Sequence, residues 1–276
     1  MIKLSAFADE VSSVFCEQIE YLVGEKISFL EIRFVNGKNV LDLTEIECKE
    51  AKQILSDNNI AVSAIASPIG KIRINEPWEQ HLLRFQRAVD IAHFFETKLI
   101  RVFSYYPAEG TNIEDYRDEV TRRMVAKVDL IKNDDLILVH ENEANIFGQG
   151  AQNCVEIIKS VNSPKLRLAY DPGNFVWNMN IIDNMKSCWP IMRPYVKHVH
   201  IKDWKVGQKT GSLPGYGDGQ IPELISELLR DNYNGFLTLE PHLNVGGQFG
   251  GNTKADQFSD AVRSVRKIMA DNGISE

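Results

Sequence analysis

The feature that most constrains the fold is a regular alternation of short apolar segments with longer amphipathic ones. The apolar segments are rich in Ile, Val, Leu or Phe and are mostly bounded by turn-forming residues. They occupy residues 2–8, 27–34, 61–66, 98–104, 136–141, 166–171, 196–203 and 236–240. Such segments are typical of strands buried on both faces of a parallel sheet. Amphipathic segments that predict helices lie at 44–58, 77–95, 113–132, 151–161, 222–231 and 254–272.

Strict alternation of strands and helices predicts parallel strands joined by right-handed crossovers. Eight such units suit a closed (β/α)₈ TIM barrel of about 250 residues, which matches a chain of 276 residues. An open doubly wound sheet usually has a glycine-rich turn after its first strand, whereas residues 9–13 here are DEVSS. No linker or low-complexity segment divides the sequence, so we predict one barrel domain over residues 1–276.

Composition restricts the partners and the compartment. The net charge of −7 argues against general affinity for nucleic acid or an anionic membrane, because both require a basic face. No stretch approaches the roughly 18 apolar residues of a membrane span, and the first residues lack the order of a secretory signal. Widely spaced cysteines at 16, 48, 154 and 188 indicate reduced thiols. We therefore expect a cytoplasmic protein.

Carboxylates and histidines gather where the last four predicted strands end. These ends are LILVHEN (136–142), LRLAYDPGNF (166–175), VKHVHIKD (196–203) and LTLEPH (237–242), and they contain four of the six histidines. A single ending of this kind is usually a turn or a helix cap. Four consecutive endings favour one shared site, since the C-terminal ends of barrel strands surround the active site. Clustered carboxylates repel one another unless a cation or strong donors neutralise them, so we predict a metal site.

The two-residue alternation of strands selects among the candidates. His198 and His200 share a strand face with Lys202, and His200 lies nearer the strand end, so His200 is the better ligand and His198 a deeper supporting residue. Glu141 is favoured over its neighbour His140 as the inward-facing side chain. The predicted ligands are Glu141, Asp171, His200 and Glu240. Three carboxylates and one imidazole suit one Mn²⁺, Zn²⁺, Co²⁺ or Mg²⁺ ion.

At these residues the chain resembles the xylose isomerase-like family of barrels, which includes sugar-phosphate isomerases and epimerases and ketose 3-epimerases. The matching segments are FADE (7–10), EIR and GKNV within 31–40, SPIGKI (67–72), RVFS (101–104), HENE (140–143), HVHIKD (198–203), GDGQIP (217–222) and LEPH (239–242). The resemblance implies the same four ligands and makes Glu141 and Glu240 the acid and base on opposite faces of a sugar. It implies a metal-dependent isomerase or epimerase of a small sugar, sugar phosphate or sugar derivative, acting through an enediolate.

Two positions depart from the ketose 3-epimerases. Asn174, three residues after Asp171, replaces a histidine, and Val206, six residues after His200, replaces an arginine. Both residues contact substrate in those relatives, so the departures argue against a free ketohexose as the natural substrate. Lys202 is a candidate cation for a substrate hydroxyl, carboxylate or phosphate instead.

The predicted substrate contacts come from the strand ends and the loops that follow them. They are Glu31, Arg33, His140, Asn142, Asn174, His198, Lys202, Trp204 and His242. Glu31 and Arg33 share a strand face and are alternatively an internal ion pair, and Arg101 is expected to pair inside the barrel. The glycine-rich segment 204–220 is long for such a loop and suggests a lid or an oligomer contact, so a homo-oligomer is an open expectation.

Three other functions are considered. The same site could dehydrate an inosose or a dehydroshikimate-like ketone, because an enolate can lose a β-hydroxyl instead of regaining a proton. Apurinic endonucleases share the fold, but their multi-zinc cluster needs more histidines than this chain supplies. A non-catalytic sugar-binding protein is disfavoured by the intact ligand set.

Overall fold

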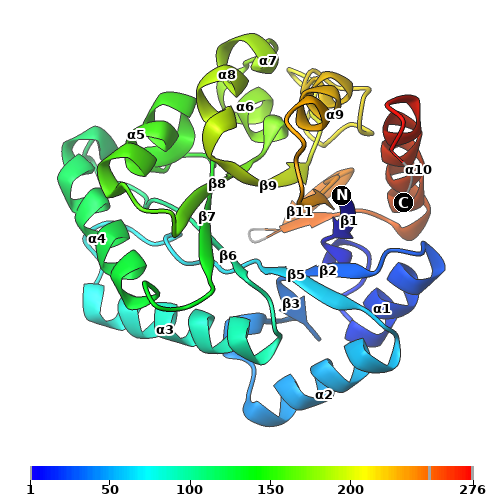
Figure 1. Cartoon of the computed structure of the whole chain (residues 1–276), viewed down its shortest axis with the longest axis horizontal. Coiled ribbons are helices and arrows are strands. Elements are labelled where there is room, and N and C mark those ends of the chain that lie inside the picture. Colours follow the sequence, from blue (N-terminus) through cyan, green and yellow to red (C-terminus); the bar gives the residue numbers. More distant parts are fainter. Residues whose placement is uncertain (1, 248–249, 275–276) are drawn as a thin grey trace.

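The computed structural model describes residues 2–247 and 250–274 and contains a closed parallel barrel. Its strands are neighbours in the order β1-β10-β9-β8-β7-β6-β5-β2. They are β1 (Lys3–Ala6), β2 (Phe29–Ile32), β5 (Ala61–Ile65), β6 (Leu99–Val102), β7 (Ile137–Glu141), β8 (Leu166–Tyr170), β9 (Val196–Ile201) and β10 (Phe236–Leu239). Each strand lies within a predicted segment, and Figure 1 shows the helices surrounding them. The predicted (β/α)₈ fold class is confirmed.

The predicted amphipathic segments all form helices. They are α2 (Glu45–Asp57), α3 (Trp78–Phe94), α4 (Arg117–Leu130), α5 (Ala151–Val161), α9 (Ile221–Arg230) and α10 (Ala255–Asp271). The predicted start of α2 is a complete capping box, because the Thr44 hydroxyl accepts the Glu47 N–H at 3.3 Å and the Glu47 carboxylate accepts the Thr44 N–H at 2.8 Å.

Several elements lie outside the predicted segments or differ in type from the predicted ones. They are α1 (Phe15–Gly24), α6 (Pro172–Met179), α7 (Asn184–Ser187), α8 (Trp189–Met192), the hairpin of β3 (Phe34–Val35) with β4 (Lys38–Asn39), the hairpin of β11 (Asn244–Gly247) with β12 (Gly250–Asn252), and 3₁₀ turns at Ala8–Glu10, Val40–Asp42, Ile113–Tyr116, Phe147–Gln149 and Arg193–Tyr195. The start of α6 has a local cause. The Asp171 carboxylate caps it by accepting the Asn174 N–H at 3.0 Å, and Pro172 occupies a first-turn position that needs no N–H partner.

The interior of the barrel changes from apolar to polar towards the C-terminal strand ends. Near the N-terminal ends, the rings of Phe29 and Phe236 lie 5.0 Å apart. Farther along the strands, a small apolar cluster forms from Ala64, Leu99, Val139 and Ala169. Two residues beyond three of these positions are the buried polar side chains Arg101, Glu141 and Asp171. Period-two alternation therefore stacks the polar side chains directly above an apolar layer.

Outward-facing strand residues and inward-facing helix residues make the main core. Ile100 and Leu138 on the strands join Phe85 and Val89 of α3 in one buried apolar cluster. Full burial of one such side chain contributes about 2 kcal/mol, so this layer holds the barrel together independently of its polar interior. Among the described residues, no helix is both long enough and apolar enough to cross a bilayer.

One carboxylate ties down the glycine-rich loop after β9. The buried Asp203 accepts backbone N–H groups of Trp204, Gly215, Gly217 and Gly219 at 2.8–2.9 Å. A Cβ at Gly217 would lie 2.3 Å from the Asp203 Oδ1 atom, and one at Gly219 would lie 2.7 Å from it. The glycines thus let the chain pass close to the Asp203 carboxylate. This carboxylate anchors residues 215–219, the second half of the loop that the sequence suggested as a lid.

We expect Asp203→Asn to lower the free energy of unfolding by about 2–4 kcal/mol, because the new amide nitrogen would face backbone N–H donors and leave them unpaired. Urea unfolding followed by circular dichroism measures the change. Asp218→Asn is the matched control, since Asp218 accepts the Val206 N–H at 2.9 Å near the surface. Equal losses in the two variants would show that the buried carboxylate does not hold the loop.

Candidate metal centre

The structure brings together the four predicted metal ligands. Glu141 ends β7, Asp171 follows β8, His200 lies in β9 and Glu240 follows β10. One ligand atom from each residue lies within 4.8 Å of the others, and all four residues are buried. They meet because they stand at or just beyond the C-terminal ends of four neighbouring strands, β7, β8, β9 and β10.

The His200 imidazole lies between two carboxylates. Its Nδ1 atom is 3.0 Å from Glu141 Oε1, and its Nε2 atom is 3.3 Å from Glu31 Oε1. Burial opposes charge on this ring, but Glu141 and Glu31 outweigh burial and raise the pKa of His200 well above its usual range. Nδ1 therefore faces the ligand set, while Nε2 is held from behind by Glu31.

His198 lies one layer deeper, as its place in the strand predicted. Its Nε2 atom is 2.6 Å from Glu31 Oε2 and 3.2 Å from Thr238 Oγ1. The side chain therefore hydrogen-bonds Glu31, and its ring packs edge-on against that of His200, with centroids 5.2 Å apart. A carboxylate that binds the second nitrogen of a metal-ligating histidine fixes the orientation of its ring. Glu31 is in that position relative to His200, and His198 supports Glu31.

The predicted internal ion pair between Glu31 and Arg33 is wrong. Both oxygens of Glu31 are taken by histidines, one at 2.6 Å from His198 Nε2 and the other at 3.3 Å from His200 Nε2. Arg33 Nε instead binds Asp9 Oδ2 at 2.8 Å, and Glu31 turns to the histidines.

Glu141 and Glu240 each form an ion pair with a different arginine. Arg101 Nη1 lies 3.2 Å from Glu141 Oε2, and Arg33 Nη1 lies 2.8 Å from Glu240 Oε1. Both guanidinium groups lie against the ring of Phe7, at 4.4 Å for Arg33 and 5.4 Å for Arg101, within the range of cation–π attraction. Phe7 thus supports both arginines, and the interior ion pair predicted for Arg101 is present.

Lys202 and two asparagines join the ligands from the side of β8. Lys202 Nζ donates to Asp171 Oδ2 at 3.0 Å, to Asn174 Oδ1 at 3.1 Å and to Glu240 Oε2 at 3.1 Å. The Asn142 side chain exchanges two hydrogen bonds with the Asp171 backbone, at 2.8 and 3.0 Å. Asn142 therefore positions Asp171, and its predicted contact with substrate stays a prediction.

His140 is directed away from the ligands. It precedes Glu141 and takes the opposite strand face, where a Cβ at Gly148 would lie 2.2 Å from its Cε1 atom. Neither ring nitrogen has a hydrogen-bond partner among the described residues. Burial and the charge of Lys127 lower the pKa of His140 to about 3, so the ring is neutral. The structure does not bring this predicted substrate contact to the site.

The other predicted substrate contacts lie at the rim of the barrel, beyond the strand ends. Trp204 is buried, packs on Trp177 with ring centroids 4.7 Å apart and donates to the Gln208 carbonyl. His242 is partly exposed, and its Nε2 atom lies 3.3 Å from Glu240 Oε1. Val206, at the departure noted in the sequence, is 42% exposed on the loop.

The sequence analysis did not select the residues that follow β1. Phe7 supports the arginines, Asp9 binds Arg33, and Glu10 accepts the His242 N–H at 3.0 Å and the Thr253 hydroxyl at 2.7 Å. All three lie in the segment FADE at the end of the first strand. The strand-end criterion used for the last four strands would have found them had it been applied to the first.

The charges around the ligands test whether a cation fits. Around the ligands, buried carboxylates outnumber buried lysine and arginine side chains by five to three when His200 is neutral, the form in which an imidazole binds a metal. They are Glu10, Glu31, Glu141, Asp171 and Glu240 against Arg33, Arg101 and Lys202. Uncompensated buried charge is costly, and a divalent ion carries the charge needed to neutralise this excess.

The pKa of Asp171 agrees with this excess of negative charge, whereas that of Glu141 shows a carboxylate already compensated by its neighbours. Burial raises the pKa of Asp171 to about 6, with Glu141 and Glu240 adding to the effect and Lys202 opposing it. Burial would also raise the pKa of Glu141, but His200 and Arg101 lower it to about 2. The charge of Asp171 is therefore less compensated by the chain itself than that of Glu141. Three oxygen donors and one nitrogen donor fit one divalent ion of the predicted kinds.

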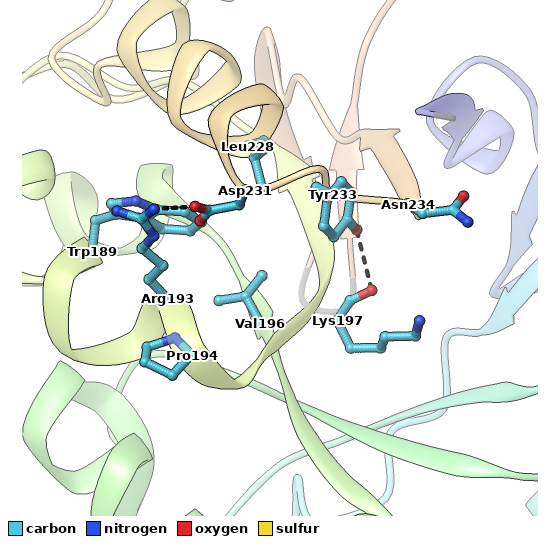
Figure 2. Close-up of a pocket in the computed structure, with 9 residues that line it drawn as sticks. All are labelled: Trp189, Arg193, Pro194, Val196, Lys197, Leu228, Asp231, Tyr233 and Asn234. Atoms are coloured by element: carbon cyan, nitrogen blue, oxygen red, sulfur yellow. Dashed lines mark hydrogen bonds and ion pairs between the residues drawn. The ribbon is translucent and has the colours of Figure 1, made fainter.

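A cavity lies at the other end of the barrel. Figure 2 shows its lining, which includes Trp189, Arg193, Tyr233 and Val196, the first residue of β9. Its volume is about 470 Å³, and none of the four ligands lines it. Because barrel active sites form at the C-terminal strand ends, cavity size does not locate the chemistry here.

Comparisons with known proteins agree with the fold. The family model described as xylose isomerase-like TIM barrel matches residues 25–270. A D-psicose 3-epimerase from Ruminiclostridium cellulolyticum is 27% identical over 230 residues, which cover 76% of this chain and 73% of that protein. A xylose isomerase-like TIM barrel protein from Mycobacterium smegmatis in complex with magnesium has a TM-score of 0.76 at 16% identity and covers 97% of this chain and 95% of its own. A probable 3-DHS dehydratase from Bacillus anthracis has a TM-score of 0.73 at 17% identity and covers 96% and 98%. The chain therefore belongs to the xylose isomerase-like TIM-barrel family.

Proposed function

We propose that the chain is a divalent-metal-dependent isomerase or epimerase of a small sugar, sugar phosphate or sugar derivative. Glu141, Asp171, His200 and Glu240 hold the ion, and Glu141 and Glu240 serve as acid and base. The observation that carries the proposal is the convergence of these four buried donors within 4.8 Å of one another. The D-psicose 3-epimerase relative supports the reaction class.

The arrangement of the two glutamates suits paired proton transfer. Each has one oxygen near His200 Nδ1, at 3.0 Å for Glu141 and 3.8 Å for Glu240, and the other oxygen against an arginine. His200 and Arg101 lower the pKa of Glu141, and Lys202, His242 and Arg33 lower that of Glu240, so both carboxylates are ionised. Glu141 comes from β7 and Glu240 from β10, with β8 and β9 between them, so they approach a ligand at this level from different sides.

A carbon-bound proton beside a carbonyl is too weakly acidic for a carboxylate to remove unaided. A bound divalent ion supplies Lewis-acid stabilisation of the negative charge that develops on the sugar oxygens. One glutamate then accepts the proton, and the other returns a proton to the same or the neighbouring carbon.

Dehydration of a related ketone is the alternative on the same residues. Incubation with panels of ketoses, inososes and sugar phosphates in deuterated water separates the two reactions. Isomerisation or epimerisation places deuterium on carbon without loss of water, whereas dehydration lowers the product mass by one water. A product lacking one water would replace the proposed isomerase with a dehydratase.

We expect the protein to bind about one divalent ion per chain, because the four donors make one closed ligand set. Elemental analysis after incubation with Mn²⁺, Zn²⁺, Co²⁺ or Mg²⁺ and gel filtration measures the stoichiometry. Protein that retains none of these ions would remove the basis for the proposed function.

Substitutions of the proposed ligands, and of the residues that support His200, test the ligand assignment. Asp171→Ala and His200→Ala should abolish ion binding with the fold retained, because the apolar layers hold the barrel together. Glu31→Gln and His198→Ala should weaken binding by about 10- to 100-fold, since they only orient His200. Isothermal titration gives the affinities and circular dichroism checks the fold. Wild-type affinity in His200→Ala would show that this ligand is misassigned.

Glu141→Gln and Glu240→Gln should abolish turnover more completely than they reduce ion binding. The amide oxygen still approaches the ion, but an amide neither accepts nor returns the carbon-bound proton. Turnover and ion affinity are measured on the same preparations, with Glu143→Gln as the control because Glu143 pairs with Lys71 at 2.8 Å, outside the ligand set. Near wild-type turnover in either test variant would exclude the two-carboxylate mechanism.

A further inference from the structure

Lys202 holds part of the same ligand set by which the proposed site binds its ion. Its ammonium group has three N–H donors, and these match three side-chain oxygens at 3.0–3.1 Å: Asp171 Oδ2, Asn174 Oδ1 and Glu240 Oε2. Asp171 and Glu240 are two of the four proposed ligands, so half of the set is already engaged by a positive charge.

The position of Lys202 is built into the chain. The side chain is only 5% exposed, and its stem passes over Gly173, where a Cβ would lie 2.6 Å from Lys202 Cγ and 2.7 Å from the Lys202 carbonyl oxygen. The glycine of the Asp-Pro-Gly turn therefore leaves room for the lysine. With its stem confined, the ammonium group has few places to go except along the row of oxygens that it contacts.

The Lys202 ammonium group and a divalent ion would compete for the same carboxylates because both are positively charged. An ammonium group and a divalent ion are attracted to the same carboxylate oxygens, and they repel each other across the few ångströms that separate positions in the site. The repulsion is strong because the residues involved are buried and poorly screened by solvent. An ion that binds Asp171 and Glu240 must therefore loosen the contacts of Lys202 with them.

We propose that the Lys202 ammonium group competes with the divalent ion for Asp171 and Glu240, so that Lys202 limits the affinity of the site and is released from these carboxylates when the ion enters. Lys202 is thus a positioning residue for the apo ligand set and a determinant of how readily the ion exchanges. This inference rests on the ion binding proposed above.

The test compares Mn²⁺ affinity, measured by competition with a fluorescent chelator, in the wild type, Lys202→Met and Lys197→Met. Lys202→Met removes the charge and keeps most of the side-chain volume. Lys197 lies on the same strand near its N-terminal end and lines the opposite cavity, so Lys197→Met is the matched control. We expect Lys202→Met to bind Mn²⁺ at least about tenfold more tightly than the wild type, with Lys197→Met unchanged.

Thermal unfolding with and without Mn²⁺ gives a second readout that does not depend on activity. Without the ion, Lys202→Met should unfold at a lower temperature than the wild type, because Asp171 and Glu240 lose their compensating charge. Mn²⁺ should raise its unfolding temperature by more than it raises that of the wild type. Lys202→Gln serves as a second neutral variant if Lys202→Met does not fold without Mn²⁺.

The outcomes separate this inference from the proposed function. Equal or weaker Mn²⁺ binding in both neutral variants, with ion binding in the wild type, would overturn the competition and leave the metal site standing. Ion binding in the neutral variants but not in the wild type would uphold the competition and reject a metal-dependent function. No ion binding in any form would reject both.

Discussion

Mutual repulsion of buried carboxylates is the constraint on which the C-terminal half of the barrel interior depends. Acidic side chains from the ends of five strands meet there, and each needs a positive partner or a proton to remain buried. The partners are arranged around the carboxylates: two arginines stack on Phe7, the ring of His200 lies between Glu141 and Glu31, and Lys202 closes the side towards β8. The positions of these cationic groups follow from where the negative charges must be compensated.

The N-terminal parts of the strands contribute to stability, and their C-terminal ends carry the candidate site. Towards their N-terminal ends they enclose aromatic and aliphatic side chains such as Phe29, Phe236 and Val139. Towards their C-terminal ends they direct polar groups such as Arg101 into the interior, and Glu141 and Glu240 are at most 3% exposed. A substrate can reach these carboxylates only when the rim side chains move aside. The chemistry of the site can therefore change without dismantling the apolar layers that keep the strands together.

Much of the fold could be predicted because parallel strands and their helices have distinct hydrophobic periods. The grouping of Glu141 with His200 was predictable for the same reason, since alternation fixes which strand residues face inward. Which side chains form ion pairs with one another was not predictable in the same way. Arg33 meets Asp9 and not Glu31, because Glu31 binds His198 and His200 from a strand far away in the sequence. The helix after Asp171 was missed because Asp-Pro-Gly is equally typical of a turn, and only the tertiary structure decides between the two.

The anchoring of the loop after β9 also bears on how the protein can be engineered. Asp203 holds the returning part of this loop through the amides of Gly215, Gly217 and Gly219, whereas residues 205–209 are exposed. A fluorophore or peptide epitope inserted among residues 205–209 would project into solvent. The same insertion among residues 215–219 would pull the amides from their carboxylate. The loop thus divides into a segment that accepts foreign sequence close to the catalytic end and one that does not.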